Sequence, residues 1–438
     1  MAVAPIAFVA PPRARPRDSG IDLVRALCVV VVVVLHALMV GVSIGPAGPV
    51  FENAAEGTAW VVPLTWVAQI MPVFFVIGGF AGATAYRRAR ERGGSGLDFV
   101  AARVPRLLLP AVLSLGAVGV GLAALAAAGV AGDIVQIAGF RYSQPLWFLG
   151  VFLLCQALLP LLHRAHERAP GRSILTLVAV AVTVDLVRGL SGLDMLGCLN
   201  LAFVWLALQQ LGFFIADGHV DALPSRTRAA VAGAAVGLLA LAVVAGVFSP
   251  DMLENLNPPT TALLLLGLAQ TMVLSLLRRR LRALSARPRV AAFTRFVTAR
   301  TMTIYLWHMP VLLAMAGVSA LGAIGFGMPL PAPSSMLWWL TRPLWIAAVL
   351  GLVAAVAVAL AGCERRRIPA STPSTTRGAM AVLLGLGAVV LQLVAGTTVL
   401  TAVLAVALLG GALRLARTAR SRQLDAGPLT AAVGLDVA

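Results

Sequence analysis

The chain has 438 residues, of which 60% are hydrophobic and only 12% are charged. Soluble domains carry about twice that fraction of charged residues, so the composition excludes a soluble globular enzyme and a disordered tail protein. The net charge is +17, and every basic residue is an arginine. Because the arginines cluster between long apolar runs, the charge indicates a membrane protein and not a nucleic-acid-binding protein.

Twelve apolar stretches approach or reach the roughly 20 residues that a membrane-spanning helix needs. The first has no small-residue cleavage site after it, so we expect a retained helix and not a signal peptide. The last two form either a tight hairpin about Gly396 or one long tilted helix. The predicted spans are 24–42, 63–85, 107–131, 146–162, 173–190, 199–216, 228–248, 260–277, 301–322, 337–361, 378–395 and 397–413.

The arginines follow the order of the spans. Segments rich in arginine alternate along the chain with loops that carry almost none. Cytoplasmic loops of membrane proteins are enriched in this way, so the pattern predicts that both termini are cytoplasmic. We interpret most of these arginines as signals of orientation and as lipid anchors.

The first predicted helix carries three ionisable residues, Asp22 just before the span 24–42 and Arg25 and His36 within it. His36 is the eleventh residue after Arg25, which brings the two to within about 20° of the same helix face, and Asp22 precedes Arg25 by three residues. The rise from Arg25 to His36 is about 16 Å. Ionisable groups inside a membrane are costly, so this stripe is a candidate functional site, with an interhelical hydrogen bond of His36 as the alternative.

A second candidate is the pair Arg103 and Arg106, which flank Pro105 where the third span is expected to enter the membrane. Proline is favoured in the first turn of a helix. The sequence therefore predicts that both guanidinium groups lie beside free backbone N–H groups, an arrangement that binds phosphate. The alternative is that both arginines only anchor the helix at the membrane surface.

A third candidate lies on the ninth span, where Thr301, Tyr305 and His308 fall on one helix face. Here an active site and an interhelical hydrogen bond are equally open. Polar and aromatic residues of the arginine-poor side form a possible outward-facing acceptor site, namely Arg141, Tyr142, Gln144, Trp147, Asn200 and Arg342.

Several kinds of chemistry find no motif in the chain. The four cysteines have no CxxC or CxxH spacing, so we expect neither a metal site nor a disulfide framework. P-loop, GxSxG, HExxH and dinucleotide-binding motifs are likewise missing from the sequence. A histidine deep in a helical bundle, with arginines suited to phosphate nearer the cytoplasm, instead favours group transfer from a phosphate-bearing donor.

These residues resemble a known family, the acyltransferase 3 family of integral-membrane O-acyltransferases. The resemblance rests on five ordered segments, which are Arg25 with His36 after ten intervening residues, Phe74–Phe80, Arg103 with Arg106, Leu146–Leu149 and Tyr305–Pro310. Two positions depart from the family pattern. Gly78 stands where many members carry serine, and Leu23 stands where glycine is usual.

The resemblance implies an all-α polytopic membrane protein with a ten-helix acyltransferase core and an extra C-terminal pair of spans, about twelve in all. We expect a cytoplasmic segment over 1–20, the membrane acyltransferase domain over 21–362, a cytoplasmic linker over 363–377, the extra pair over 378–415 and a cytoplasmic tail over 416–438. The location implied is the plasma membrane.

The implied activity is transfer of an acyl group, typically acetyl, from cytoplasmic acyl-CoA to a hydroxyl group. The acceptor is a cell-surface glycan, a glycolipid or a secreted small molecule, and the other partners are membrane lipids, without nucleic acid or metal. An exporter or flippase of a lipid-linked glycan, which would consume no acyl-CoA, is the alternative.

The resemblance also suggests a role for each candidate residue. His36 acts as the base or carries the acyl group, and Asp22 directs Arg25. His308 or Tyr305 stabilises the oxyanion. The phosphates of CoA are held by Arg25, Arg103 and Arg106.

Overall fold

The computed structural model describes residues 18–46, 48–54, 58, 60–364, 372 and 374–417. Most of the predicted N-terminal segment and C-terminal tail, and part of the predicted linker, lie outside these residues. The described elements are α1 Ser19–Met39, β1 Val40–Gly45, β2 Gly48–Asn53, α2 Val61–Ala68, α3 Met71–Glu91, α4 Gly96–Ala127, α5 Gly132–Ser143, α6 Trp147–Arg168, α7 Pro170–Ser191, α8 Asn200–Ala216, α9 His219–Ala222, α10 Ser225–Val244, α11 Ala262–Ser285, α12 Pro288–Ala299, α13 Thr301–Phe326, α14 Met336–Ala359, α15 Ala361–Glu364, α16 Thr375–Ala395 and α17 Val399–Leu415.

The protein is an all-α polytopic membrane protein. Eleven helical segments of the described chain are long and apolar enough to cross a membrane, and α17 is a shorter apolar helix of 17 residues. Each of the twelve predicted stretches overlaps one of these helices. Apolar side chains also cover the outside of the bundle, as at Leu190, which is 88% exposed. This surface suits contact with lipid.

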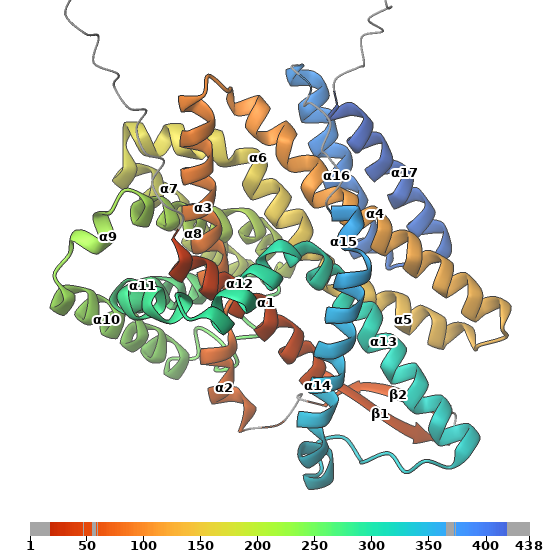
Figure 1. Ribbon diagram of the computed structural model, residues 1–438. Coiled ribbons are helices and arrows are strands. Elements are labelled where there is room, and N and C mark those ends of the chain that lie inside the picture. Colours follow the sequence, from red (N-terminus) through yellow and green to blue (C-terminus); the bar gives the residue numbers. More distant parts are fainter. Residues whose placement is uncertain are drawn as a thin grey trace, which may run out of the picture.

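Helix α1 lies inside the bundle, where it contacts α3, α11, α12, α13 and α14 (Figure 1). Asp18 caps its first turn by accepting hydrogen bonds from the backbone N–H groups of Gly20 and Ile21. The same carboxylate pairs with Arg278 and Arg282 of α11. The start of α1 is therefore fixed against a neighbouring helix by a cap and by two ion pairs.

Helices α3 and α8 cross at two glycines. A Cβ atom on Gly79 would lie 1.9 Å from the carbonyl oxygen of Gln209, and one on Gly212 would lie 2.0 Å from that of Val76. Only residues without a side chain allow the two backbones to approach this closely, as at many helix crossings in membranes.

The second predicted span, 63–85, contains a break that the sequence analysis missed. Helix α2 ends at Ala68, and α3 begins at Met71 with Pro72 in its first turn. Gln270 of α11 satisfies the interrupted backbone, since its side chain donates to the Gln69 carbonyl (2.8 Å) and accepts from the Val73 N–H (3.0 Å). Non-helical backbone inside a membrane bundle needs such partners.

The first predicted span, 24–42, is wrong at its end, because α1 stops at Met39 and the chain continues as a β-hairpin. Strands β1 and β2 pair antiparallel, with Val42 opposite Phe51. Val42 packs against Ala316 and Ala320 of α13. The alternating small and β-branched residues after Met39 suit a strand.

Helices α16 and α17 form a hairpin, which settles the alternative that the sequence left open. Gly396 takes a positive φ of 69° between them, and Thr398 caps α17 in a capping box with Thr401. The pair lies beside α4 and α6 (Figure 1). A Cβ atom on Gly119 of α4 would lie only 2.8 Å from Ala402, so the hairpin packs closely on the bundle.

Candidate active site

A cavity of about 250 Å³ lies within the bundle, with His36 in its wall. The wall combines α1, the α2–α3 break, the α5–α6 junction, the loop before α11 and the first half of α13. Its lining residues are Val29, Val32, Leu35, His36, Met39, Ala68, Gln69, Ile70, Met71, Phe74, Arg141, Gln144, Pro145, Trp147, Phe148, Leu253, Leu256, Asn257, Thr301, Tyr305 and Met309.

The tautomer of His36 follows from its backbone contact. Its Nδ1 lies 2.8 Å from the carbonyl oxygen of Val32, one turn earlier in α1. A carbonyl oxygen can only accept, so Nδ1 carries the proton and Nε2 carries the lone pair. This arrangement orients the ring and leaves one nitrogen able to accept a proton.

His308 lies against His36. The two ring centroids are 4.8 Å apart, and the ring planes meet at 69°. The His308 Nδ1 donates to the carbonyl oxygen of Tyr305, while its buried Nε2 has no hydrogen-bond partner among the described residues. The sequence predicted that each histidine shares a helix face with polar residues of its own helix, and the structure brings the two imidazoles of α1 and α13 together.

The Tyr305 hydroxyl donates to the carbonyl oxygen of Pro145 at 2.7 Å. Its ring packs edge-on against Phe148, with the centroids 4.9 Å apart. Phe148 in turn packs against Phe74, at 5.2 Å. The three segments with Phe74, Phe148 and Tyr305, which carried the family resemblance, therefore meet at one wall of the cavity.

The three candidate arginines form a second group. Arg25 pairs with Asp22 at 2.9 Å, so this carboxylate fixes the direction of the Arg25 side chain. The Arg103 guanidinium lies over the ring of Phe99, 4.6 Å from its centroid, and interacts electrostatically with Arg25 and Arg106. Three clustered cations of this kind can hold an anion with several charges.

The predicted position of Arg103 and Arg106 on their helix is wrong. Ser95 and Asp98 form a capping box that starts α4 at Gly96, so Pro105 lies inside the helix and not in its first turn. The free N–H groups of this helix therefore lie far from both arginines. Any phosphate held here depends on the side chains alone.

The two histidines, His36 and His308, lie in a different part of the bundle from the three candidate arginines. The rise along α1 from Arg25 to His36 is about 16 Å. Among the described residues that line the cavity, none is one of the three candidate arginines.

The expected acceptor-side residues are divided. Arg141, Gln144 and Trp147 line the cavity. Tyr142 is buried and bonds Ser114 (2.8 Å), and Asn200 donates to Asp185 (2.8 Å). Gln69 and Asn257 line the same cavity, although the sequence did not predict them as site residues. Pro72, which follows Gln69 by three residues inside an apolar run, was the signal for the break.

A comparison with protein families matches residues 18–363 to the acyltransferase domain of the acyltransferase 3 family. The chain belongs to the acyltransferase 3 family. It is therefore a membrane acyltransferase, as its signature segments predicted. The acyltransferase 3 match ends before α16 and α17. No curated protein and no solved structure matches the chain.

Some arginines that we interpreted as orientation signals also hold helices together. Arg87 of α3 donates to Nε2 of His163 at 3.0 Å and pairs with Asp217, which also contacts His166 at 2.9 Å. Burial raises the pKa of Asp217, but hydrogen bonds from His166 and Arg87 outweigh it and hold that pKa below its ordinary value. This network connects α3, α6 and the end of α8.

Proposed function

We propose that this acyltransferase moves an acyl group, acetyl in the simplest case, from acyl-CoA to a hydroxyl group of a glycan, a glycolipid or a secreted small molecule. One observation carries the proposal: an imidazole whose Nδ1–H is bonded to its own helix lies in the wall of a cavity that polar side chains also line. Such an imidazole is suited to act as a general base at neutral pH.

In the proposed reaction, Nε2 of His36 takes the proton from the acceptor hydroxyl as its oxygen attacks the thioester carbonyl. The new C–O bond forms, the C–S bond breaks, and the proton passes from His36 to the leaving sulfur of CoA. The His308 ring packs against the His36 ring, with the two centroids 4.8 Å apart. His308 is therefore proposed as a positioning residue for His36.

The contacts change which groups we propose for oxyanion stabilisation. The hydroxyl proton of Tyr305 is already donated to Pro145, and the His308 Nδ1–H is donated to the Tyr305 carbonyl. Arg141 and Gln144 line the same cavity and carry N–H donors. We therefore propose these two side chains as the source of hydrogen bonds to the developing oxyanion.

On the donor side, we propose that Arg25, Arg103 and Arg106 hold the phosphates of CoA. The pantetheine arm then has to cover the rise of about 16 Å along α1 to reach His36. Because the arginine-rich segments are proposed to be cytoplasmic, the donor enters from the cytoplasm and the acceptor meets His36 from the other side. The membrane proposed is the plasma membrane.

The test uses the purified full-length protein in detergent, incubated with acetyl-labelled acetyl-CoA and a glycolipid extract of the host. His36→Ala is compared with His219→Ala, which removes an imidazole that is 61% exposed and outside the cavity. Loss of a general base lowers turnover by about 100-fold or more. We expect that loss in H36A, near-normal turnover in H219A, and unchanged thermal unfolding in both.

Near-normal labelling by H36A would reject His36 as the base. Failure of the wild-type protein to label any acceptor while it still binds the glycolipid would favour the exporter or flippase.

A further inference from the structure

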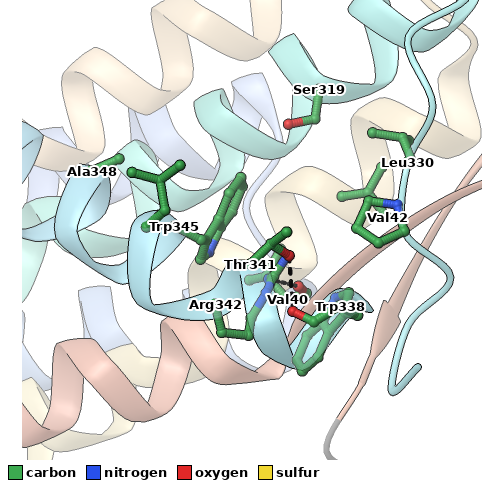
Figure 2. Close-up of a pocket in the computed structure, with 11 residues that line it drawn as sticks. Val40, Val42, Ser319, Leu330, Trp338, Thr341, Arg342, Trp345 and Ala348 are labelled. Atoms are coloured by element: carbon green, nitrogen blue, oxygen red, sulfur yellow. Dashed lines mark hydrogen bonds between the residues drawn. The ribbon is translucent and has the colours of Figure 1, made fainter. Parts of the chain in front are cut away.

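A second pocket, of about 280 Å³, shares no lining residue with the cavity that holds His36. Figure 2 shows this second pocket. Its walls come from β1, α13, the loop before α14 and the first half of α14. The lining residues are Val40, Val42, Ser319, Leu330, Pro331, Trp338, Thr341, Arg342, Leu344, Trp345 and Ala348. Arg342 is the only ionisable side chain among these described residues.

Arg342 is buried, with 9% of its surface exposed. Figure 2 shows its side chain between Trp338 and Trp345, whose ring centroids lie 4.0 Å and 5.0 Å from the guanidinium carbon. One guanidinium nitrogen, Nη1, donates to the carbonyl oxygen of Val40 at 3.2 Å. No described carboxylate lies within ion-pair distance of Arg342. A buried cation inside a helical bundle is costly unless an anion or another partner compensates it.

The polar atoms left without a partner are all donors. Nε of Arg342 and the indole Nε1 atoms of Trp338 and Trp345 are buried and have no hydrogen-bond partner among the described residues. A guanidinium and an indole can only donate, so the ligand that satisfies them must accept several hydrogen bonds and carry negative charge. A phosphate group meets both conditions, because its oxygens bind arginine in a bidentate manner.

We propose that this pocket binds a phosphate group through Arg342, with the two tryptophans as flanking walls and additional donors. The other lining side chains are mainly apolar, among them Val42, Leu330 and Leu344. Leu344 is 77% exposed, so the wall continues onto the outside of the bundle. Arg342 follows the start of α14 by six residues, or about 9 Å along the helix axis, so it lies near the end of the helix and not at its middle. These features favour a phosphate that is attached to a lipid.

The experiment measures binding to the delipidated full-length protein in neutral detergent by native mass spectrometry. Three probes separate the contributions: dioleoyl phosphatidic acid, dioleoylglycerol with the same chains but no phosphate, and inorganic phosphate. The variants are Arg342→Gln and Trp345→Phe; the second removes the indole N–H donor and keeps a smaller aromatic ring in its place. The control is Arg188→Gln, which removes one charge from an ion pair with Asp194 at the end of α7.

We expect phosphatidic acid to bind more tightly than dioleoylglycerol. R342Q should weaken this binding by about tenfold or more and W345F by a smaller factor, because a charged hydrogen bond is stronger than a neutral one. R188Q should bind as the wild type does. If inorganic phosphate competes with phosphatidic acid at equal concentration, the phosphate site stands and its ligand is a soluble anion.

Equal binding of phosphatidic acid and dioleoylglycerol would overturn the proposal. The same conclusion would follow if R342Q, with unchanged thermal unfolding, bound phosphatidic acid as the wild type does. If R342Q does not fold, W345F provides the test. Binding of phosphatidic acid to W345F with wild-type affinity would reject the proposal that the guanidinium and the indole N–H groups together bind the phosphate. None of these outcomes depends on acyl transfer, so the proposal and the proposed function fail separately.

Discussion

The crossing of α3 and α8 gives a prediction whose size follows from the structure. In Gly79→Ala, the new methyl group would lie 1.9 Å from the Gln209 carbonyl oxygen and 2.7 Å from its carbon. These are backbone atoms that cannot rotate away, so the helices must separate by about 1.5 Å, and overpacking of this kind costs about 1–3 kcal/mol. We expect G79A to lower the free energy of unfolding by at least about 1 kcal/mol.

The neighbouring glycine supplies the control. A Cβ atom on Gly78 would lie 3.4 Å from the ring of Phe152, an ordinary contact distance. Gly78→Ala adds the same methyl group to the same helix, and we expect a change of about 0.5 kcal/mol or less. The measurement is tryptophan fluorescence of both variants during SDS titration in mixed micelles, because Trp205 lies on α8 and stacks on Phe75 of α3 (4.4 Å).

Separation of the two helices should also move Phe74, which lines the cavity. We therefore expect turnover of G79A to fall, while G78A keeps wild-type turnover. Equal stability of G79A and G78A would refute the close backbone approach, and with it the reason why glycine is required at the crossing.

Two further predictions concern Tyr305 and Asp18. Tyr305→Phe leaves the Pro145 carbonyl without its donor, so the free energy of unfolding should fall by about 1–2 kcal/mol. Turnover of Y305F should fall far less than that of H36A. An equal loss of turnover in the two variants would show that the phenol acts in catalysis. Burial raises the pKa of Asp18, but hydrogen bonds from Arg282 and Arg278 outweigh it and lower that pKa from 3.8 to about 2. The stabilisation is therefore complete above pH 3.8 and is lost as the pH falls through 2, so Asp18→Asn should be less stable than wild type by about 2 kcal/mol at pH 7. Thermal unfolding in detergent should show a smaller difference in stability between wild type and D18N at pH 3 than at pH 7. The same difference at both pH values would contradict the proposed stabilisation of the Asp18 carboxylate by Arg278 and Arg282.

The sequence predicted the spans well because crossing a membrane requires a length and a composition that can be read directly. It predicted the start of α4 poorly, since the capping residues Ser95 and Asp98 lie in a polar segment before the apolar run. The β-hairpin was missed because Val40 and Val42 are as apolar as the helix before them.

The candidate site divides in the same way. Helical spacing predicted that Asp22 and Arg25 are neighbours, because the relation is local to one helix. The contact between His36 and His308 joins two helices far apart in the chain, and no periodicity within either helix contains it. The hydrogen bond from Tyr305 to Pro145 likewise depends on how α13 packs against the start of α6.

Helix α1 carries Arg25 and His36 on one unbroken rod, fixed at its start by Asp18. A rod of this kind acts as a ruler, because neither end can move relative to the other without breaking backbone hydrogen bonds. If the phosphates of the donor bind at Arg25, only a molecule whose reactive carbon lies about 16 Å from those phosphates reaches His36. One residue inserted into the valine run would lengthen the ruler by about 1.5 Å and rotate His36 by about 100°. The membrane-spanning helix α1 would thus also select the donor by the distance between the donor's phosphates and its reactive carbon.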